Sequence, residues 1–587
     1  MKKTMKIYAI FATALVLGSV SCSKFDEMSK NPYALESAPA ESYVHPIMFN
    51  TQYNLISVFR GTTVFLSQYA VSTSSEVSSR VIGNYNIPEG TSDDVWTGLY
   101  PQYGNAMAMY TQAVAEKNDK IMAVALILRS FIITQLTDTY GDIPFKEAGL
   151  LSLRDDEGNY TTRYDSQKEI YKSVICMLET ANSLLAKEDK TIAFNSICDK
   201  TFDGNYEKWR RFGNSLYARV LMRIGMKVME EDGGVLQLDD DQWESVNIAN
   251  KLSEMYSCFT SGGGEYPMMR SRDDRPLIPF SDQNETEHTP FFSTTSGIWN
   301  TVAVCDVLTR RMLSTKKGVD EFGITYYESV LSNSGGHRED PRYDCWWRKI
   351  HGMPNHLTGS DVTRFLASPT HRSNSDNSVI GRMVRGKDAN GNDEPSAITG
   401  KVYDLKNAPY YPLMQYSELM FIFAEAGVRG WIGALSSFGA YLSLFKEAVT
   451  ESIMEWNPYV TADSDEVVEY LNHVVNGELY SGSTLNTDNA LEAVLTQKWL
   501  STFFIGIESW CDYRRTGYPL LRTDGPAAGN DHILPTRLRY PSDEPYRNPE
   551  YYQEAVNGWL GGTNNIQTDV WWAATEESFN TRLLGRQ

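Results

Sequence analysis

The residues that could carry out covalent chemistry form no known catalytic motif in this chain of 587 residues. There is no G-x-S-x-G nucleophile elbow and no H-E-x-x-H zinc motif, and Gly262-Gly-Gly264 lacks the Lys and Ser or Thr that complete a phosphate-binding loop. Some pair among the 74 acidic residues can always be nominated for glycoside hydrolysis, but no motif here fixes the separation that such a pair needs. The sequence therefore predicts a protein that is not an enzyme and uses no cofactor.

Candidate metal ligands are also scattered. His351, His356 and His371 lie in one irregular stretch, but their spacing follows no ligand rule, so we interpret them as solvated loop histidines and predict no metal site. Besides Cys22 there are six cysteines with no C-x-x-C pair, and their spacing fixes no disulfide pairing. They are Cys176, Cys198, Cys258, Cys305, Cys345 and Cys511.

A different chemistry is offered by aromatic residues in segments rich in Gly, Asn and charge. Sugar rings stack their C–H faces on aromatic rings, and their hydroxyl groups need planar donors and acceptors, so such a surface binds carbohydrate without a nucleophile. The adjacent Trp346 and Trp347 point to opposite faces if the segment is extended, so only one of them meets the ligand. The predicted ligand-binding residues are Tyr85, Tyr266, Arg270, Asp273, Trp299, Trp346 and Trp347.

The element that organises the rest of the chain is a predicted helix starting at Asp119, which can cap it. Its residues 121–128 are apolar on every side, so we expect a helix buried among other helices. Polar residues from Arg129 onward interrupt the run before the roughly 20 apolar residues that a bilayer span needs. Gly141 and Pro144 should end the helix, because glycine accepts positive φ and proline cannot continue the hydrogen-bond pattern.

Further helices come in adjacent pairs. Ser166 and Glu169 form a capping box before an apolar stripe, and similar stripes begin at Trp209 and Leu435. The pairs have the size of tetratricopeptide units, although no strict repeat of ~34 residues is present. We predict a mainly α fold with a helical scaffold at about 41–231 and 410–520, a loop-rich ligand-binding region at about 232–409 and a C-terminal tail at 521–587. Long loops on a helical scaffold usually carry function.

The N-terminus has the pattern of an export signal. Lysines at positions 2, 3 and 6 precede an apolar stretch and the small residues before Cys22. We interpret residues 1–21 as a signal peptide, Cys22 as a lipidated cysteine and 22–40 as a tether. The net charge of −20 argues against a nucleic-acid partner, which would call for a basic surface.

Four blocks of sequence resemble the SusD/RagB-like family of Bacteroidetes outer-membrane nutrient-binding lipoproteins. In chain order they are LTDTYGDIPFKEA at 136–148, Y-x-E-x-x-F-x-x-A-E-A at 416–426, Q-K-W to R-R-T-G-x-P at 497–519, and P-x-R-x-x-Y-P-x-x-E at 535–544. The resemblance implies a tetratricopeptide-like helical solenoid. It also implies that Asp138, Glu425 and Arg514-Arg515 are structural, that Asp340-Pro-Arg342 is a structural turn, and that Trp499 and Trp510 lie in the core.

The resemblance further implies a cell-surface lipoprotein of the outer membrane that binds oligosaccharides. Its partner would be a SusC-like TonB-dependent transporter, which takes the ligand inward. The RagB branch handles peptides, so a peptide-binding lid is the closest alternative. A secreted glycoside hydrolase and a scaffold without a ligand of its own are further alternatives.

Overall fold

The computed structural model describes most of the helical part of the chain and portions of its loop-rich region. The described residues are 38–72, 82–83, 85, 87–149, 161–187, 194–278, 302–312, 315–329, 340–342, 353–354, 357, 360–368, 386–387, 393–394, 412–457, 460–476, 484–522 and 534–574. Cys22, Trp299, Trp346, Trp347, and the three loop histidines lie outside them.

Helices dominate the described residues. The first group is η1 (Ala40–Tyr43), α2 (Val44–Val58), η2 (Phe59–Thr63), α3 (Val64–Leu66), α4 (Asp93–Ala115), α5 (Asp119–Tyr140), α6 (Gln167–Ala186), α7 (Tyr206–Asp232) and α8 (Ile248–Ser261). Short helices η5 (Arg272–Asp274), α9 (Asp306–Met312) and α11 (Ser360–Ala367) follow. The second group is α13 (Tyr416–Val428), η9 (Gly433–Leu435), α14 (Phe438–Trp456), α15 (Asp465–Asn476), α16 (Ala490–Ser501), α17 (Glu508–Thr516), α18 (Glu544–Arg547) and α19 (Pro549–Asn557).

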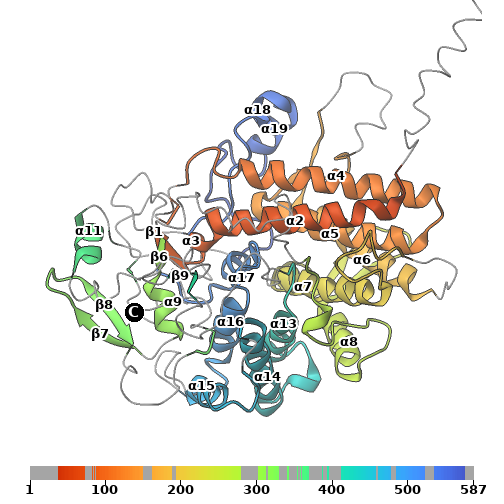
Figure 1. The fold of residues 1–587 in the computed structure, drawn as a ribbon. Helices are drawn as coiled ribbons and strands as arrows, with labels where there is room; N and C mark the ends of the chain where they lie inside the picture. The colour runs from red at the N-terminus through yellow and green to blue at the C-terminus, as the bar shows by residue number, and fades with distance from the viewer. Residues whose placement is uncertain are drawn as a thin grey trace, which may run out of the picture.

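Consecutive helices pack side by side, as the paired stripes predict. Helix α4 packs on α5, α5 on α6, α6 on α7 and α7 on α8, and α13 packs on both α14 and α16. Figure 1 shows α2 and α4 running across one side of the molecule and α13 to α16 lying on the other, with α7 and α17 between them. The mainly α prediction is confirmed, and the helical part extends through α8, beyond the predicted end of its first segment.

Helix α5 is the buried centre of the first group. Nearly every residue from Ile121 to Tyr140 is buried. By length and composition it is the one helix of the described chain that could cross a membrane, but 89% of its apolar window is buried inside the protein. The predicted cap is wrong by one residue, because the side chain of Asn118, not Asp119, accepts the Ile121 N–H at 3.1 Å. Asn118 has the non-helical backbone that a capping residue needs.

Strands within the described residues are short and form two-stranded antiparallel sheets. The pairs are β1 (Ala70–Ser72) with β6 (Val302–Val304), β2 (Ile143–Pro144) with β3 (Tyr164–Asp165), β4 (Val235–Gln237) with β5 (Ser245–Asn247), β7 (Thr315–Val319) with β8 (Thr325–Ser329), and β9 (Gly386–Lys387) with β10 (Asp393–Glu394). The β1–β6 pair, in which Val71 is opposite Ala303, joins the N-terminal helices to the loop-rich region.

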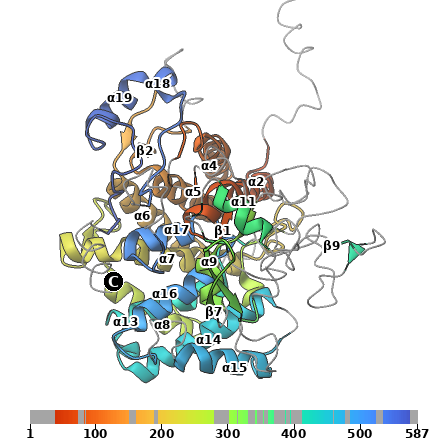
Figure 2. The same ribbon diagram turned by 90° about the vertical axis from the view of Figure 1, so that its left-hand side faces the viewer.

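The loop-rich region has a small core of its own, separate from the main one. Val71 and Ala303 contribute to it from the β1–β6 pair, and Tyr326, Val362 and Phe365 contribute from β8 and α11. Figure 2 shows α9, α11 and the β7–β8 hairpin gathered beside β1 on the same side of the molecule. The β1–β6 sheet is thus one of the places where the loop-rich region contacts the helical scaffold; Arg342, which binds Gln497 of α16 at 2.7 Å, is another.

Candidate functional site

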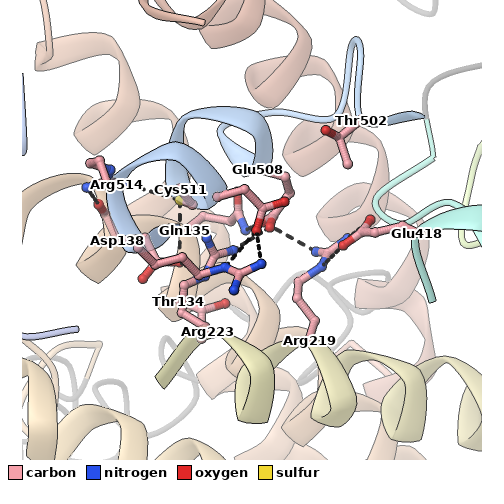
Figure 3. A network of polar contacts seen from close by, with 12 residues as sticks. Thr134, Gln135, Asp138, Arg219, Arg223, Glu418, Thr502, Glu508, Cys511 and Arg514 are labelled. Carbon is pink, nitrogen blue, oxygen red and sulfur yellow. Dashed lines mark hydrogen bonds and ion pairs between the residues drawn. The ribbon is translucent and has the colours of Figure 1, made fainter. Parts of the chain in front are cut away.

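A buried network of ionised side chains lies where α5, α7 and α17 meet (Figure 3). One carboxylate oxygen of Glu508 accepts a hydrogen bond from Gln135 at 3.0 Å, and the other accepts one from Arg223. Arg219 lies 3.5 Å from Glu508 and binds both carboxylate oxygens of Glu418, each at 2.7 Å or less. A cavity of about 10 Å³ borders Glu508, which is room for a single water molecule. The network has no space for a substrate, so it is part of the scaffold.

Asp138 extends this network to the end of α5. Its carboxylate accepts hydrogen bonds from the Tyr171 hydroxyl at 2.6 Å and the Trp572 indole N–H at 2.8 Å, and Arg223 lies 3.4 Å away. Burial raises the pKa of Asp138 despite these partners. Burial also lowers the pKa of Arg514 to about 9, because the charged form of that guanidinium loses solvation. These groups are enclosed by one another, and their perturbed pKa values reflect packing.

The carbonyl groups at the C-terminal end of α5 receive donors from the last part of the chain. Leu538 N donates to the Thr139 oxygen at 2.9 Å, Arg537 Nε donates to the Tyr140 oxygen at 3.0 Å, and Arg514 donates to the Asp138 oxygen at 2.6 Å. A helix end leaves such carbonyl groups without partners within the helix. Two of these donors lie within residues 535–574, which we call the C-terminal cap, and Arg514 of α17 supplies the third.

Three other structural predictions are confirmed. Arg515 binds both oxygens of Glu425 at 2.6 Å each, and both side chains are buried. Arg342 binds Asp340 within a turn that is also buried. Trp499 and Trp510 belong to the core, as expected, with exposed fractions of 0% and 1%. The conspicuous motifs of this sequence thus build the scaffold.

The prediction that Tyr85 and Tyr266 offer exposed rings is wrong. The Tyr266 ring is 3% exposed, and its hydroxyl donates to Glu179 at 2.8 Å and accepts from Lys251 at 2.7 Å. The Tyr85 ring is 5% exposed, and its hydroxyl donates to the Arg522 carbonyl oxygen at 3.2 Å. Both rings are buried, and their hydroxyl groups bind residues far away in the sequence. Neither ring therefore has a free face on which a sugar could stack.

Arg270 and Asp273 are exposed on one turn beside η5. The Arg270 guanidinium donates to the Gly262 carbonyl oxygen, and the Asp273 carbonyl oxygen accepts from Lys208 at 2.7 Å. The carboxylate of Asp273 remains on the surface. Arg270 and Asp273 are therefore both exposed near η5, whereas Tyr85 lies beside Arg522.

Sequence reasoning missed a groove on the N-terminal helices. It has a volume of about 560 Å³ and lies between the end of α2 with η2 and the first turns of α4. Its end is closed where Asn54 donates to the Gly98 carbonyl oxygen at 2.9 Å, and a Cβ atom on Gly98 would come within 2.8 Å of Asn54. The polar lining residues include Asn54, Ser57, Arg60, Thr91, Asp94 and Thr97.

The described lining of this groove combines hydroxyl and amide groups with one carboxylate and one guanidinium group. Asp94 is the one carboxylate among its described lining residues, whereas glycoside hydrolysis requires two carboxyl groups at a defined separation. The π-helical η2 forms part of the wall, and such turns occur frequently at functional sites. No group of three or more potential metal ligands occurs within the described residues.

Comparison with known proteins identifies the fold family. The sequence matches the SusD-like family, described as starch-binding and associating with the outer membrane, over residues 32–237 and 315–541. The chain belongs to the SusD-like family. It matches no curated protein. The interval between the two matched parts contains Tyr266, Arg270, Asp273 and Trp299, so the family match carries no assignment for these residues.

Solved SusD homologues share this fold. A homologue from Bacteroides uniformis aligns with a TM-score of 0.62 at 20% identity, covering 92% of this chain and 100% of that one. A chitin-binding homologue from Flavobacterium johnsoniae gives 0.60 at 19% identity, covering 91% and 99%. One from Bacteroides fragilis gives 0.59 at 20% identity, covering 90% and 98%. These identities establish the SusD-like helical fold for this chain and leave its ligand open to proposal.

Proposed function

We propose that this SusD-like protein binds oligosaccharides at the outer membrane and is not an enzyme. The observation that carries the proposal is the family match over residues 32–237 and 315–541, to a family described as starch-binding and associating with the outer membrane. The hydroxyl and amide groups that line the groove beside α4 support it, because neutral donors and acceptors suit sugar hydroxyl groups.

The proposal includes the place of the protein in the cell. Acylation at Cys22 would hold it on the outer membrane, since acyl chains contribute about 0.8 kcal/mol per buried CH₂ group. From the cell surface it would deliver its ligand to a SusC-like TonB-dependent transporter. The export pattern of residues 1–21 and the resemblance of the four signature blocks support this arrangement.

Calorimetry against a panel of neutral hexasaccharides tests the binding proposal. The panel contains the malto, chito, xylo, manno and cello series, and peptides of similar length serve as the competing ligand class. We expect saturable binding to one glycan series and no new reducing ends after prolonged incubation. Binding to peptides alone would support the peptide-binding alternative, and new reducing ends would show a hydrolase.

The remaining loop residues are tested on the glycan that binds. We propose that Trp299 and one of Trp346 and Trp347 stack on the ligand, with Arg270 and Asp273 supplying hydrogen bonds. Each stacked ring contributes about 0.5–1.5 kcal/mol beyond its buried area, so Trp299→Ala should weaken binding severalfold. Wild-type affinity in alanine variants of all three tryptophans would place the glycan elsewhere.

The anchor is tested by Cys22→Ala, with Cys176→Ala as the matched control. We expect the first variant to leave the membrane fraction and the second to remain there, because Cys176 lies within α6. If Cys22→Ala protein still sediments with outer membranes after a carbonate wash, the lipoprotein interpretation fails.

A further inference from the structure

The groove between α2, η2 and α4 contains hydrogen-bonding groups that the described protein does not use. The Asn54 amide donates to the Gly98 carbonyl oxygen, but its own oxygen accepts no hydrogen bond from any described residue. The hydroxyl groups of Ser57 and Thr91 and the carboxylate of Asp94 likewise have no hydrogen-bond partner among the described residues. The Asn54 oxygen, two hydroxyl groups and one carboxylate therefore line the groove without a hydrogen-bond partner in the part of the chain that the structure describes.

The charge of the lining favours a neutral ligand. Arg60 and Asp94 are the two ionised side chains among the described lining residues, and their charges are opposite. An acidic ligand would be attracted by Arg60 but repelled by Asp94, and a basic ligand would meet the reverse. An uncharged ligand can bind through hydroxyl groups alone. The volume of about 560 Å³ falls within the roughly 300–1,000 Å³ typical of small-molecule sites.

An exposed aromatic ring, that of Tyr53, lies on the same face of α2 as Ser57, which lines the groove. Tyr53 lies four residues before Ser57 on α2, so the two side chains share one face of the helix. The Tyr53 ring is 38% exposed and stacks on Phe49, with ring centroids 6.3 Å apart and planes inclined by 29°. A sugar ring that enters the groove can stack on Tyr53 while its hydroxyl groups reach Ser57.

We propose that this groove is a glycan subsite that binds an uncharged oligosaccharide segment through Asn54, Ser57, Thr91 and Asp94, with Tyr53 as its stacking ring. The assignment rests on the proposed function and adds a site on the N-terminal helix pair to the loop residues considered above. The π-helical turn η2 places Arg60 and Gly61 in the wall of the groove.

Gly61 makes the subsite testable without disturbing the core. A Cβ atom on Gly61 would meet no atom within 4 Å, so a tryptophan there has open space and would fill the groove. Gly439, at the exposed start of α14, has the same open surroundings and serves as the matched control. The variants Gly61→Trp and Gly439→Trp are compared with wild type by calorimetry on the panel glycan that wild type binds best.

We expect Gly61→Trp to lower glycan affinity at least about tenfold and Gly439→Trp to leave it unchanged, with equal melting temperatures in all three proteins. A second variant, Ser57→Ala with Thr91→Val, removes two hydroxyl groups and keeps the side-chain volume nearly constant. It should lower affinity about threefold to tenfold, the loss expected for one or two hydrogen bonds, and it decides the matter if Gly61→Trp does not fold.

The outcomes separate the two proposals. If wild type binds a glycan and both groove variants keep wild-type affinity, the subsite assignment is overturned while the proposed function stands. If wild type binds none of the panel glycans, the proposed function and the subsite fail together. Loss of binding in the groove variants but not in Gly439→Trp supports both.

Discussion

The indole N–H of Trp572 donates a hydrogen bond to the carboxylate of Asp138, 2.8 Å away and 434 positions earlier in the chain. The Tyr171 hydroxyl donates to the same oxygen at 2.6 Å. Asp138 lies in the last turn of the central helix α5, and Trp572 belongs to the C-terminal cap. A single buried carboxylate thus joins the first helical group to the last residues of the fold.

Replacing the indole donor should lower stability without affecting ligand binding. Trp572→Phe keeps an aromatic ring but leaves Asp138 with one donor fewer, so we expect the free energy of unfolding to fall by about 1–3 kcal/mol. Denaturation in urea measures the change. The neighbouring Trp571→Phe is the control, because that indole N–H donates to Glu231 at an exposed site; it should change stability by less than about 0.5 kcal/mol. Equal effects of the two variants would contradict this role of Trp572.

The turn after α5 should not tolerate a side chain. Gly141 has φ of +85°, and a Cβ atom there would lie 2.2 Å from the ring of Trp559. We expect Gly141→Ala to lower the free energy of unfolding by at least about 2 kcal/mol, from strained backbone and the clash together. Gly104→Ala is the control, because a Cβ atom there meets nothing within 4 Å. If Gly141→Ala were as stable as wild type, Trp559 and the C-terminal cap could move away from the added Cβ atom without loss of stability, and the prediction would be wrong.

The free energy of unfolding should decrease in acid because Glu425 becomes protonated. Burial alone would raise the pKa of this carboxyl, but Arg515 and Arg429 outweigh it and hold the pKa at about 2. A folded-state pKa below the unfolded value stabilises the fold above pH 4.5, and that contribution disappears as the pH falls through about 2. We expect the stability advantage of wild type over Glu425→Gln, about 3 kcal/mol at pH 6, to shrink across this window. An advantage that does not change with pH would contradict the ion pair.

Asp142 should make the fold less stable as the pH rises, the opposite of the effect of Glu425. Burial raises its pKa to about 6, although the Gln167 N–H partly offsets this effect. A raised folded-state pKa stabilises the fold below pH 3.8, and this contribution is lost as the pH rises through about 6. Asp142→Asn can still accept from Gln167, so we expect it to be more stable than wild type by about 1–2 kcal/mol at pH 8 and equally stable at pH 4. Thermal melting at the two pH values measures the difference.

Tyr266 should behave as a core residue. Tyr266→Phe removes the hydroxyl between Glu179 and Lys251, so we expect a loss of about 1–2 kcal/mol in stability and unchanged glycan affinity. A stable Tyr266→Phe protein with tenfold weaker binding would return this ring to the ligand site. Phe194 and Tyr206, which stack at 5.1 Å, offer an unrelated aromatic pair for comparison.

Helices were predictable because their signals are local. Ser166 caps α6 as predicted, with its side-chain oxygen accepting the Glu169 N–H at 3.3 Å, and α5 is buried on nearly all sides, as its apolar residues require. Exposure of single aromatic residues was not predictable, because the partners of Tyr266 lie on α6 and α8 and no local pattern reveals them. The groove was missed for the same reason. Its wall is a π-helical turn with no sequence signature, closed by the approach of Gly98 to Asn54.

The C-terminal cap on α5 also sets an order of events for a chain that is made from its N-terminus. The Tyr140 carbonyl oxygen receives its donor from Arg537, 397 residues later. Contacts over such long separations form late in folding. The end of the central helix therefore gains this hydrogen bond only after most of the chain has been made. Until then the carbonyl group remains open to water and to other partners, which a helix capped by its own neighbours avoids.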